Sequence, residues 1–215
     1  MALPLSPEAQ RLKETIDFDK RIYFVLLVLI FLVIRYFTDV LVVDAIPESE
    51  RIKAEGGLTF FYIFNALNYI WTPFALLWKF TVISFLFWFG GFMLGYKVSY
   101  KELWQFALVA EVVFIFPELI RLLVYIEPNT GVTYKEIEEY RALSVLSLIG
   151  AQNVEPQYRY ALATINVFEI LYGILWTYGF HMISRRSLSA SAIVVVVSYF
   201  IPLIIWLIWY SLAYR

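Results

Sequence analysis

Long apolar runs separated by short polar segments dominate the sequence. At about 1.5 Å per residue, about 20 consecutive apolar residues cross the roughly 30 Å hydrocarbon core of a bilayer. The pattern therefore predicts an all-α integral membrane protein, a five-helix transmembrane bundle with short N-terminal and interfacial helices. The predicted crossings cover residues 23–43, 74–95, 102–126, 160–183 and 192–211.

The polar N-terminal segment, residues 1–22, predicts a short cytoplasmic helix ahead of a single transmembrane domain over residues 23–215. The Ser-Pro-Glu sequence at residues 6–8 is typical of a helix start, with an N-cap, a proline at the first helical position and an acid in the first turn. We expect this helix over residues 10–19. The segment lacks the early apolar core of a cleavable signal peptide, so the first crossing is expected to direct insertion.

The run over residues 58–95 contains one charge, Lys79, and is too long for a single crossing. It also lacks a polar turn that would divide it into two. Pro73 is its natural break, because a proline inside a helix removes a backbone hydrogen bond. We predict an interfacial or re-entrant helix from Thr59 to Trp71, followed by one crossing. If that first piece also crosses, the chain has six spans and both termini lie inside.

Residues 127–159 form the longest polar stretch of the chain. Pro128 and Gly131 indicate a turn near its start. The acidic segment over residues 134–140 predicts a helix, and the apolar segment over residues 143–149 is expected to pack against the membrane domain.

The distribution of basic residues favours an N-terminus inside and a C-terminus outside. One predicted inner loop carries Lys97 and Lys101 and the other carries Arg185 and Arg186, whereas the predicted outer segments are rich in glutamate. Short inner loops of membrane proteins are enriched in lysine and arginine.

Composition agrees with a membrane domain and excludes several classes of function. The chain is 61% hydrophobic and 16% charged, whereas soluble domains are about 45–50% apolar and about 25% charged. A net charge of −1 gives no electrostatic case for binding nucleic acid. Without cysteine there is no thiolate metal site, and His181, the single histidine, is expected to be exposed at the inner interface. No catalytic or nucleotide-binding motif is present, so we expect no enzyme activity and no cofactor.

Ionisable residues fall within the predicted crossings, and each would cost roughly 2.5–3.5 kcal/mol at a helix centre if it were unpaired. Their spacing suggests two pairs on single helix faces, four and three residues apart, with the others left for contacts across helices. The set predicts structural contacts, with side chains near the span ends reaching water, or a proton or ion pathway. The pairs are Arg35 with Asp39 and Glu118 with Arg121, and the remaining residues are Lys79, Glu111 and Glu169.

Helix-breaking, small and amide residues also fall within the predicted crossings. Pro117 and Pro202 predict kinks that serve as hinges or as static packing inside a bundle. Gly91 and Gly95 are four residues apart, which predicts a helix-packing surface. Asn166 shares a helix face with the glutamate three residues later, and this predicts a polar contact with another helix.

Short motifs follow one another in the middle and the end of the chain. A glycine-rich span end and an aromatic-polar loop precede a span with an internal proline, in Gly95-Tyr96-Lys97-Val98-Ser99-Tyr100-Lys101-Glu102 and Phe114-Ile115-Phe116-Pro117. Further along come Ala163-Thr164-Ile165-Asn166-Val167-Phe168-Glu169 and Arg185-Arg186. This order resembles the Yip1-domain family of small multi-pass membrane proteins, over roughly residues 70–213.

The resemblance implies a membrane-embedded scaffold or accessory factor, in a family with no agreed catalytic set. The chain lacks the long N-terminal region and the Asp-Leu-Tyr-Gly-Pro-like element of eukaryotic members. This favours a compact bacterial-type member in the cytoplasmic (inner) membrane, with its N-terminus inside.

We therefore expect a non-enzymatic accessory or scaffold protein that binds other integral membrane proteins in a larger complex, in protein export or membrane trafficking. The alternative is a transporter or permease subunit that moves a small solute or protons past Glu111 and Glu169. An odd number of spans without a visible repeat argues mildly against the second class. The lipid bilayer is the expected partner in both cases, and nucleic acid is not.

Overall fold

The computed structural model describes residues 7, 18–45, 56–126 and 134–214, and these form helices joined by turns. The helix predicted over residues 10–19 lies outside the described residues, apart from its last two positions. Most of the charged loop after the first crossing and the turn at Pro128 and Gly131 also lie outside them.

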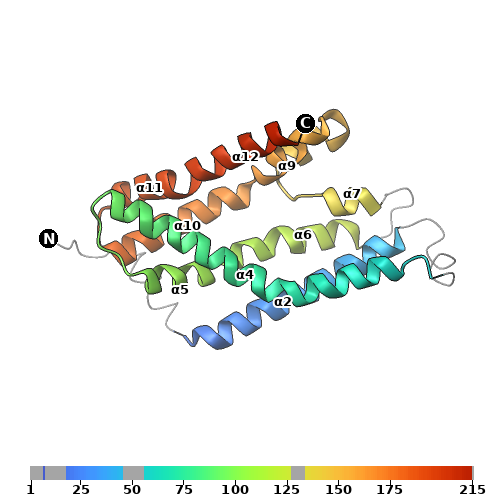
Figure 1. The fold of residues 1–215 in the computed structure, drawn as a ribbon, viewed down its shortest axis with the longest axis horizontal. Helices are drawn as coiled ribbons and strands as arrows, with labels where there is room; N and C mark the ends of the chain where they lie inside the picture. Colours follow the sequence, from blue (N-terminus) through green and yellow to red (C-terminus); the bar gives the residue numbers. More distant parts are fainter. Residues whose placement is uncertain (1–6, 8–17, 46–55, 127–133, 215) are drawn as a thin grey trace.

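Long helical rods lie side by side and make up most of the molecule (Figure 1). Two of them are single long helices, α2 (Lys20–Asp44) and α4 (Thr59–Met93). The others are α5 (Tyr100–Ala110) continued by η1 (Glu111–Phe114) and α6 (Ile115–Tyr125), then α10 (Val167–Ser184), then α11 (Leu188–Val195) continued by η3 (Val196–Phe200) and α12 (Ile201–Ala213).

Short helices gather at one end of the bundle, on the side where α4 begins and α6 ends (Figure 1). They are α7 (Tyr134–Glu139), α8 (Val145–Ile149), η2 (Ala151–Asn153) and α9 (Pro156–Thr164). The helix predicted over residues 134–140 is therefore confirmed. The segment over residues 143–149 packs inward mainly through Leu146, whereas Leu148 is 83% exposed, so its predicted packing holds only in part.

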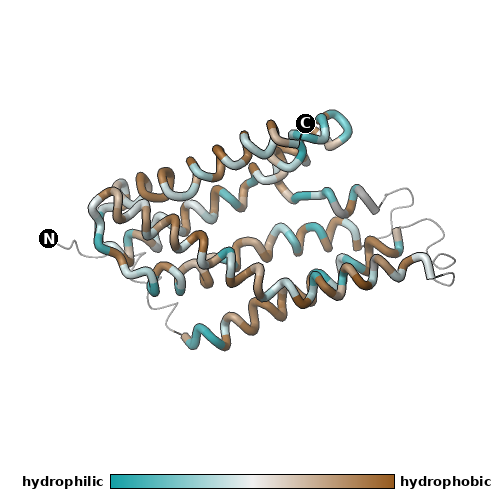
Figure 2. The backbone as a smooth tube through the Cα atoms, viewed as in Figure 1, coloured by the Kyte–Doolittle hydropathy of each residue, from teal (hydrophilic) through white to brown (hydrophobic). Residues whose placement is uncertain are grey.

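Among the residues that the structure describes, three helices are long and apolar enough to cross a membrane: Lys20–Asp44, Tyr62–Met93 and Leu188–Ala213. The brown, apolar colouring along these rods shows the same property (Figure 2). Large apolar side chains on their outer faces are exposed, including Val33, Phe64 and Ile205. An apolar outer surface of this kind is stable in lipid rather than in water.

The predicted break at Pro73 is wrong, because α4 runs without interruption from Thr59 to Met93. Its 35 residues correspond to a length of about 52 Å, well beyond the roughly 30 Å hydrocarbon core. Prolines are tolerated inside membrane helices when neighbouring groups satisfy the freed backbone. The residues from Thr59 to Trp71 are therefore the first part of a long helix and not a separate one.

The predicted crossing over residues 160–183 is also corrected, because the chain leaves the helix between α9 and α10. The side chain of Asn166 caps α10 by accepting a hydrogen bond from the backbone N–H of Glu169, at 2.9 Å. Backbone hydrogen bonds tie this break to the segment before α8, from Val145 N to Ile165 O (3.0 Å) and from Val167 N to Leu143 O (3.2 Å). Only α10 continues along the bundle.

Unlike Pro73, the prolines of the third and fifth predicted crossings follow segments that depart from α-helical geometry. Pro117 comes three residues after the 3₁₀ segment η1, and Pro202 comes two residues after the π segment η3. A proline has no backbone N–H to donate to the carbonyl of the preceding turn. The helix before it can therefore adopt the tighter 3₁₀ or the wider π geometry. The third and fifth predicted crossings are thus continuous rods with a local change of pitch.

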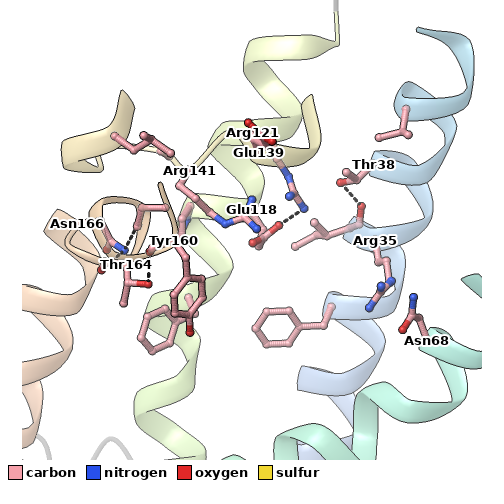
Figure 3. Close-up of a pocket in the computed structure, with 18 of the residues that line it drawn as sticks. Arg35, Thr38, Asn68, Glu118, Arg121, Glu139, Arg141, Tyr160, Thr164 and Asn166 are labelled. Atoms are coloured by element: carbon pink, nitrogen blue, oxygen red, sulfur yellow. Dashed lines mark hydrogen bonds and ion pairs between the residues drawn. The ribbon is translucent and has the colours of Figure 1, made fainter. Parts of the chain in front are cut away.

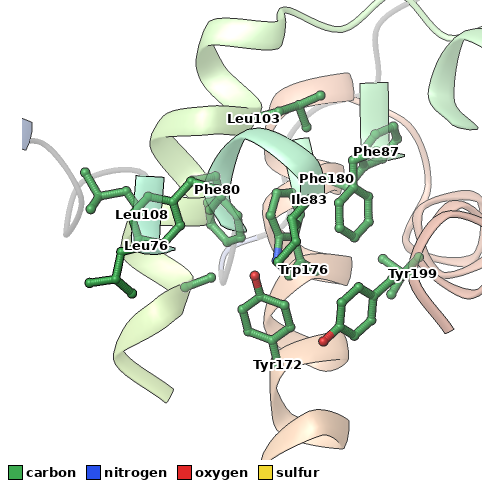
Figure 4. Close-up of a cluster of buried hydrophobic side chains, with 14 of the residues drawn as sticks. Leu76, Phe80, Ile83, Phe87, Leu103, Leu108, Tyr172, Trp176, Phe180 and Tyr199 are labelled. Carbon is green, nitrogen blue, oxygen red and sulfur yellow. The ribbon is translucent and has the colours of Figure 1, made fainter. Parts of the chain in front are cut away.

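Aromatic side chains fill the core of the bundle toward the end that holds the turns over residues 94–99 and 185–187 (Figure 4). The rings of Phe87 and Trp176 stack with centroids 3.9 Å apart, and Phe106 meets Trp176 edge-on at 5.0 Å. The backbones approach closely here, because a Cβ at Gly179 would lie 2.2 Å from the Phe106 ring and a Cβ at Gly90 would lie 1.9 Å from Ser198 Oγ. This end is densely packed.

Candidate functional site

A cavity of about 960 Å³ lies in the other half of the bundle, toward the short helices (Figure 3). It is open to the outside and is lined by residues of α2, α4, η1, α6, α10 and the segments around α7 to α9. All the charged and amide residues singled out within the predicted crossings line it, which are Arg35, Asp39, Lys79, Glu111, Glu118, Arg121, Asn166 and Glu169. Residues from distant parts of the sequence thus meet in one place.

An ion pair between α4 and η1 lies at the inner end of the cavity. Lys79 Nζ donates a hydrogen bond to Glu111 Oε1 at 2.7 Å. The Glu111 side chain is 3% exposed and that of Lys79 is 36% exposed. The ammonium group also lies 3.8 Å from the centre of the Phe114 ring, a cation–π contact. The carboxylate therefore has its cation on another helix, its Oε2 is buried without a hydrogen-bond partner among the described residues, and the lysine keeps access to the cavity.

A second carboxylate, Glu169, lies at the start of α10 and accepts a hydrogen bond from the hydroxyl of Tyr199 in η3. Tyr199 is buried, and its ring contacts that of Tyr172 at 5.3 Å. Both irregular segments, η1 and η3, thus contribute a polar side chain to this region, Glu111 from one and Tyr199 from the other. Single-turn departures from the α-helix are frequent at functional sites.

The pairs predicted within single helices have different outcomes. Arg121 donates to Glu118 on the same face of α6, in agreement with their spacing. The described residues form no ion pair between Arg35 and Asp39. Asp39 Oδ2 instead accepts the hydroxyl of Tyr69 in α4 at 2.6 Å. The packing of α4 against α2 places the Tyr69 hydroxyl within hydrogen-bond distance of Asp39, whereas Arg35, one turn away on α2, does not pair with it.

Further charged groups surround the cavity where it meets the short helices (Figure 3). Arg159 in α9 pairs with Glu139 in α7 at 3.4 Å and also donates to the Val154 carbonyl at 3.1 Å. Arg141 lies beside Glu118 in the close-up. Side chains of both charges therefore line the cavity at its inner end and at this outer end.

Sequence reasoning missed several of these residues. Tyr69 and Tyr199 donate to Asp39 and Glu169, but nothing in the sequence distinguishes these two from the other tyrosines of the chain. Glu139 and Arg159 read as ordinary loop charges because they lie in a polar stretch. The asparagine followed three residues later by glutamate is an N-terminal helix signature, and it could have located the start of α10.

Two expectations about residues outside the cavity need correction. Gly95 does not pack against a helix: with φ of +74° it closes α4 in a left-handed turn, and the N–H of Tyr96 bonds the Gly91 carbonyl at 2.8 Å. Gly91 does meet another helix, since a Cβ there would lie 3.2 Å from the Phe180 ring.

His181 is buried rather than exposed, and its Nδ1 contacts the Arg186 carbonyl.

Within the described part of the chain, no three His, Asp or Glu side chains are grouped so as to hold a metal ion. The cavity instead offers ion pairs, phenols and amides, which can hold water or a polar solute by hydrogen bonds and charge. No family model matches the sequence, and no curated protein or solved structure matches it. The resemblance to the Yip1-domain family stays a prediction.

Proposed function

We propose that this chain is a multi-pass integral membrane protein whose cavity binds a small polar solute, as a transporter or permease subunit does. The observation that carries the proposal is the gathering of the eight charged and amide residues singled out within the predicted crossings around one cavity of about 960 Å³. A cavity of 300–1,000 Å³ is the usual size of a small-molecule site. Ionisable residues inside a membrane domain characteristically face such cavities and mark solute or ion paths.

The proposed topology has five crossings with the N-terminus inside, in a bacterial inner membrane. Five rods run along the bundle, so the turns at residues 94–99 and 185–187 lie at the same end (Figure 1). The Arg186 guanidinium lies 5.2 Å from the centre of the Tyr96 ring, which joins these two turns. Basic residues thus gather at one end, as the positive-inside tendency requires for a cytoplasmic face. The cavity then faces the outer side.

A screen for solutes followed by flux measurements tests this function. The purified protein is heated with amino acids, carboxylates, phosphate esters and sugars, and a bound solute is expected to raise its melting temperature. Uptake of that solute into proteoliposomes is then compared for the wild type, Glu111→Gln and Glu102→Gln. We expect at least tenfold slower uptake for Glu111→Gln and unchanged uptake for Glu102→Gln, whose side chain is exposed at the start of α5. Stabilisation by none of these solutes would contradict the proposal.

A scaffold that binds other membrane proteins is the second candidate, and the length of α4 favours it. The first part of this helix exposes a run of apolar side chains, including Phe60, Phe64 and Trp71, at 64–76% exposure. A helix of about 52 Å exceeds the hydrocarbon core by about 20 Å, so a tilt or a partner protein must shield the excess. Stoichiometric co-purification of a partner that Trp71→Ala releases, with no solute bound, would favour the scaffold.

A further inference from the structure

Arg35 lines the cavity, and the described residues offer it no ion pair. Lys79, Arg121 and Arg159 each form an ion pair with a glutamate. Arg35 Nε, like Nε of Arg121, is buried and has no hydrogen-bond partner among the described residues, but Arg35 also lacks an ion pair among them. Its described contact is the Tyr69 ring, whose centre lies 5.9 Å from the guanidinium carbon. A buried donor without an acceptor carries a desolvation penalty that a ligand can remove.

The nearby carboxylate does not fill this role. Asp39 lies one turn along α2 from Arg35, and its Oδ2 is bonded to the Tyr69 hydroxyl at 2.6 Å. The phenol thereby holds Asp39 on the α4 side. The negative charge of Asp39 still lowers the positive potential at Arg35. It would therefore repel an anion bound by the guanidinium.

The Arg35 guanidinium lies beside Asn68 of α4 (Figure 3). Asn68 and Asn65 line the same part of the cavity, and both are half-buried. An amide NH₂ group adds donors beside the planar fork of the guanidinium. Ten residues separate this level of α4, marked by Tyr69, from Lys79, so it lies about 15 Å from the inner ion pair.

We propose that Arg35 and Asn68 bind an oxyanion, the carboxylate or phosphate group of the ligand. This inference rests on the proposed solute-binding function and specifies the class of solute. The guanidinium matches two oxygens of a carboxylate or phosphate in a bidentate pair. The rest of the solute then extends along the cavity toward Lys79 and Glu111. A free solute and a lipid headgroup present the same oxyanion, and the test separates them.

The test uses the full chain in dodecyl maltoside and follows its melting temperature. Inorganic phosphate and acetate are titrated against sodium chloride at matched ionic strength, and short-chain phosphatidylglycerol is titrated in a separate arm. The variants are Arg35→Gln and Asp39→Asn, with Arg21→Gln as the matched control, since Arg21 is exposed near the start of the same helix.

Phosphate or acetate is expected to stabilise the wild type beyond chloride. Arg35→Gln should raise the apparent Kd at least tenfold, Arg21→Gln should change it less than twofold, and Asp39→Asn should lower it because a like charge is removed. Arg35-dependent binding of phosphatidylglycerol alone would support the site and assign the oxyanion to a lipid. No stabilisation by any of these probes, or equal losses in Arg35→Gln and Arg21→Gln, would overturn the inference.

The two proposals fail separately. If an uncharged solute binds and is taken up while no oxyanion binds, the solute-binding function stands and the role of Arg35 is wrong. If phosphate binds through Arg35 while no solute is taken up into proteoliposomes, the oxyanion site stands and the transport function is wrong.

Discussion

The two ends of the bundle are built from the same rods but differ in how those rods meet. At the aromatic end, defined by Phe87, Phe106, Trp176 and Phe180, side chains interdigitate and glycines bring the backbones close. At the cavity end, from Lys79 to Arg159, the rods separate around an open cavity of about 960 Å³ that charged side chains line. The comparison suggests that one end holds the bundle together while the other leaves room for a ligand. Substitutions at the two ends should therefore have different consequences.

The largest effect is expected at the aromatic end. Trp176 is fully buried, and Trp176→Ala should lower the free energy of unfolding by about 3–5 kcal/mol because it leaves a cavity in a packed core. Trp209→Ala is the matched control, since Trp209 is 54% exposed on the apolar surface, and it should change stability by about 0.5 kcal/mol or less. Thermal unfolding in detergent, followed by circular dichroism, measures both. Equal losses in the two variants would contradict the assigned core.

A similar or slightly smaller loss in the free energy of unfolding is expected when only the lysine of the Lys79–Glu111 ion pair is replaced. Lys79→Met leaves Glu111 buried without its cation and should cost about 3–5 kcal/mol. Replacing both residues, as Lys79→Met with Glu111→Leu, should recover most of that loss, because no buried charge then remains. The same thermal unfolding measurement compares the single and double variants. A double variant less stable than the single one would show that the pair itself stabilises the fold.

Close backbone approach between α4 and η3 predicts an intermediate effect. Gly90→Ala should cost about 1–3 kcal/mol, because its new Cβ would lie 1.9 Å from Ser198 Oγ and 3.0 Å from Ser198 Cβ. Ser198→Gly in the same chain should restore part of the stability by making room. If Gly90→Ala is neutral in the melting measurement, the two rods are less tightly packed than described.

The smallest effect is expected where the cavity meets the short helices. The ion pair of Glu139 and Arg159 is partly exposed, at 34% and 25% of each side chain. A double-mutant cycle with Glu139→Gln and Arg159→Gln should give a coupling of about 0.2–1 kcal/mol. A coupling above about 2 kcal/mol would mean that this pair is shielded from water and that the cavity end is closed.

Hydrophobic pattern predicted the rods well, because run length and apolar content are local properties. The first crossing over residues 23–43 lies within α2, and the fifth over residues 192–211 lies within the rod Leu188–Ala213. Continuity through Pro73 was not predictable from local propensity, since proline breaks soluble helices but is tolerated in membrane helices. The start of α10 is marked in the sequence by the capping residue Asn166, but the apolar residues on both sides favoured one continuous crossing.

The members of the site were predictable, whereas their partners were not. Charge within an apolar run identified Lys79, Glu111 and Glu169, because such residues are costly in lipid. Which groups satisfy them depends on helix rotation and on packing between segments far apart in the chain. The phenols of Tyr69 and Tyr199 became partners only when α4 and η3 were placed against other helices. Spacing along one helix therefore identified the Glu118 and Arg121 pair but not the partner of Asp39.

The accessibility of single cysteines tests most directly whether water fills the cavity. The chain contains no cysteine, so Thr72→Cys and Phe74→Cys each introduce one thiol at nearly the same depth on α4. Thr72 lines the cavity, whereas Phe74 is 57% exposed on the apolar surface. A membrane-impermeant, charged thiol reagent reacts with the thiolate, which forms in water rather than in lipid. We predict that it modifies the cysteine at position 72 at least tenfold faster in proteoliposomes, and equal rates would contradict a water-filled cavity.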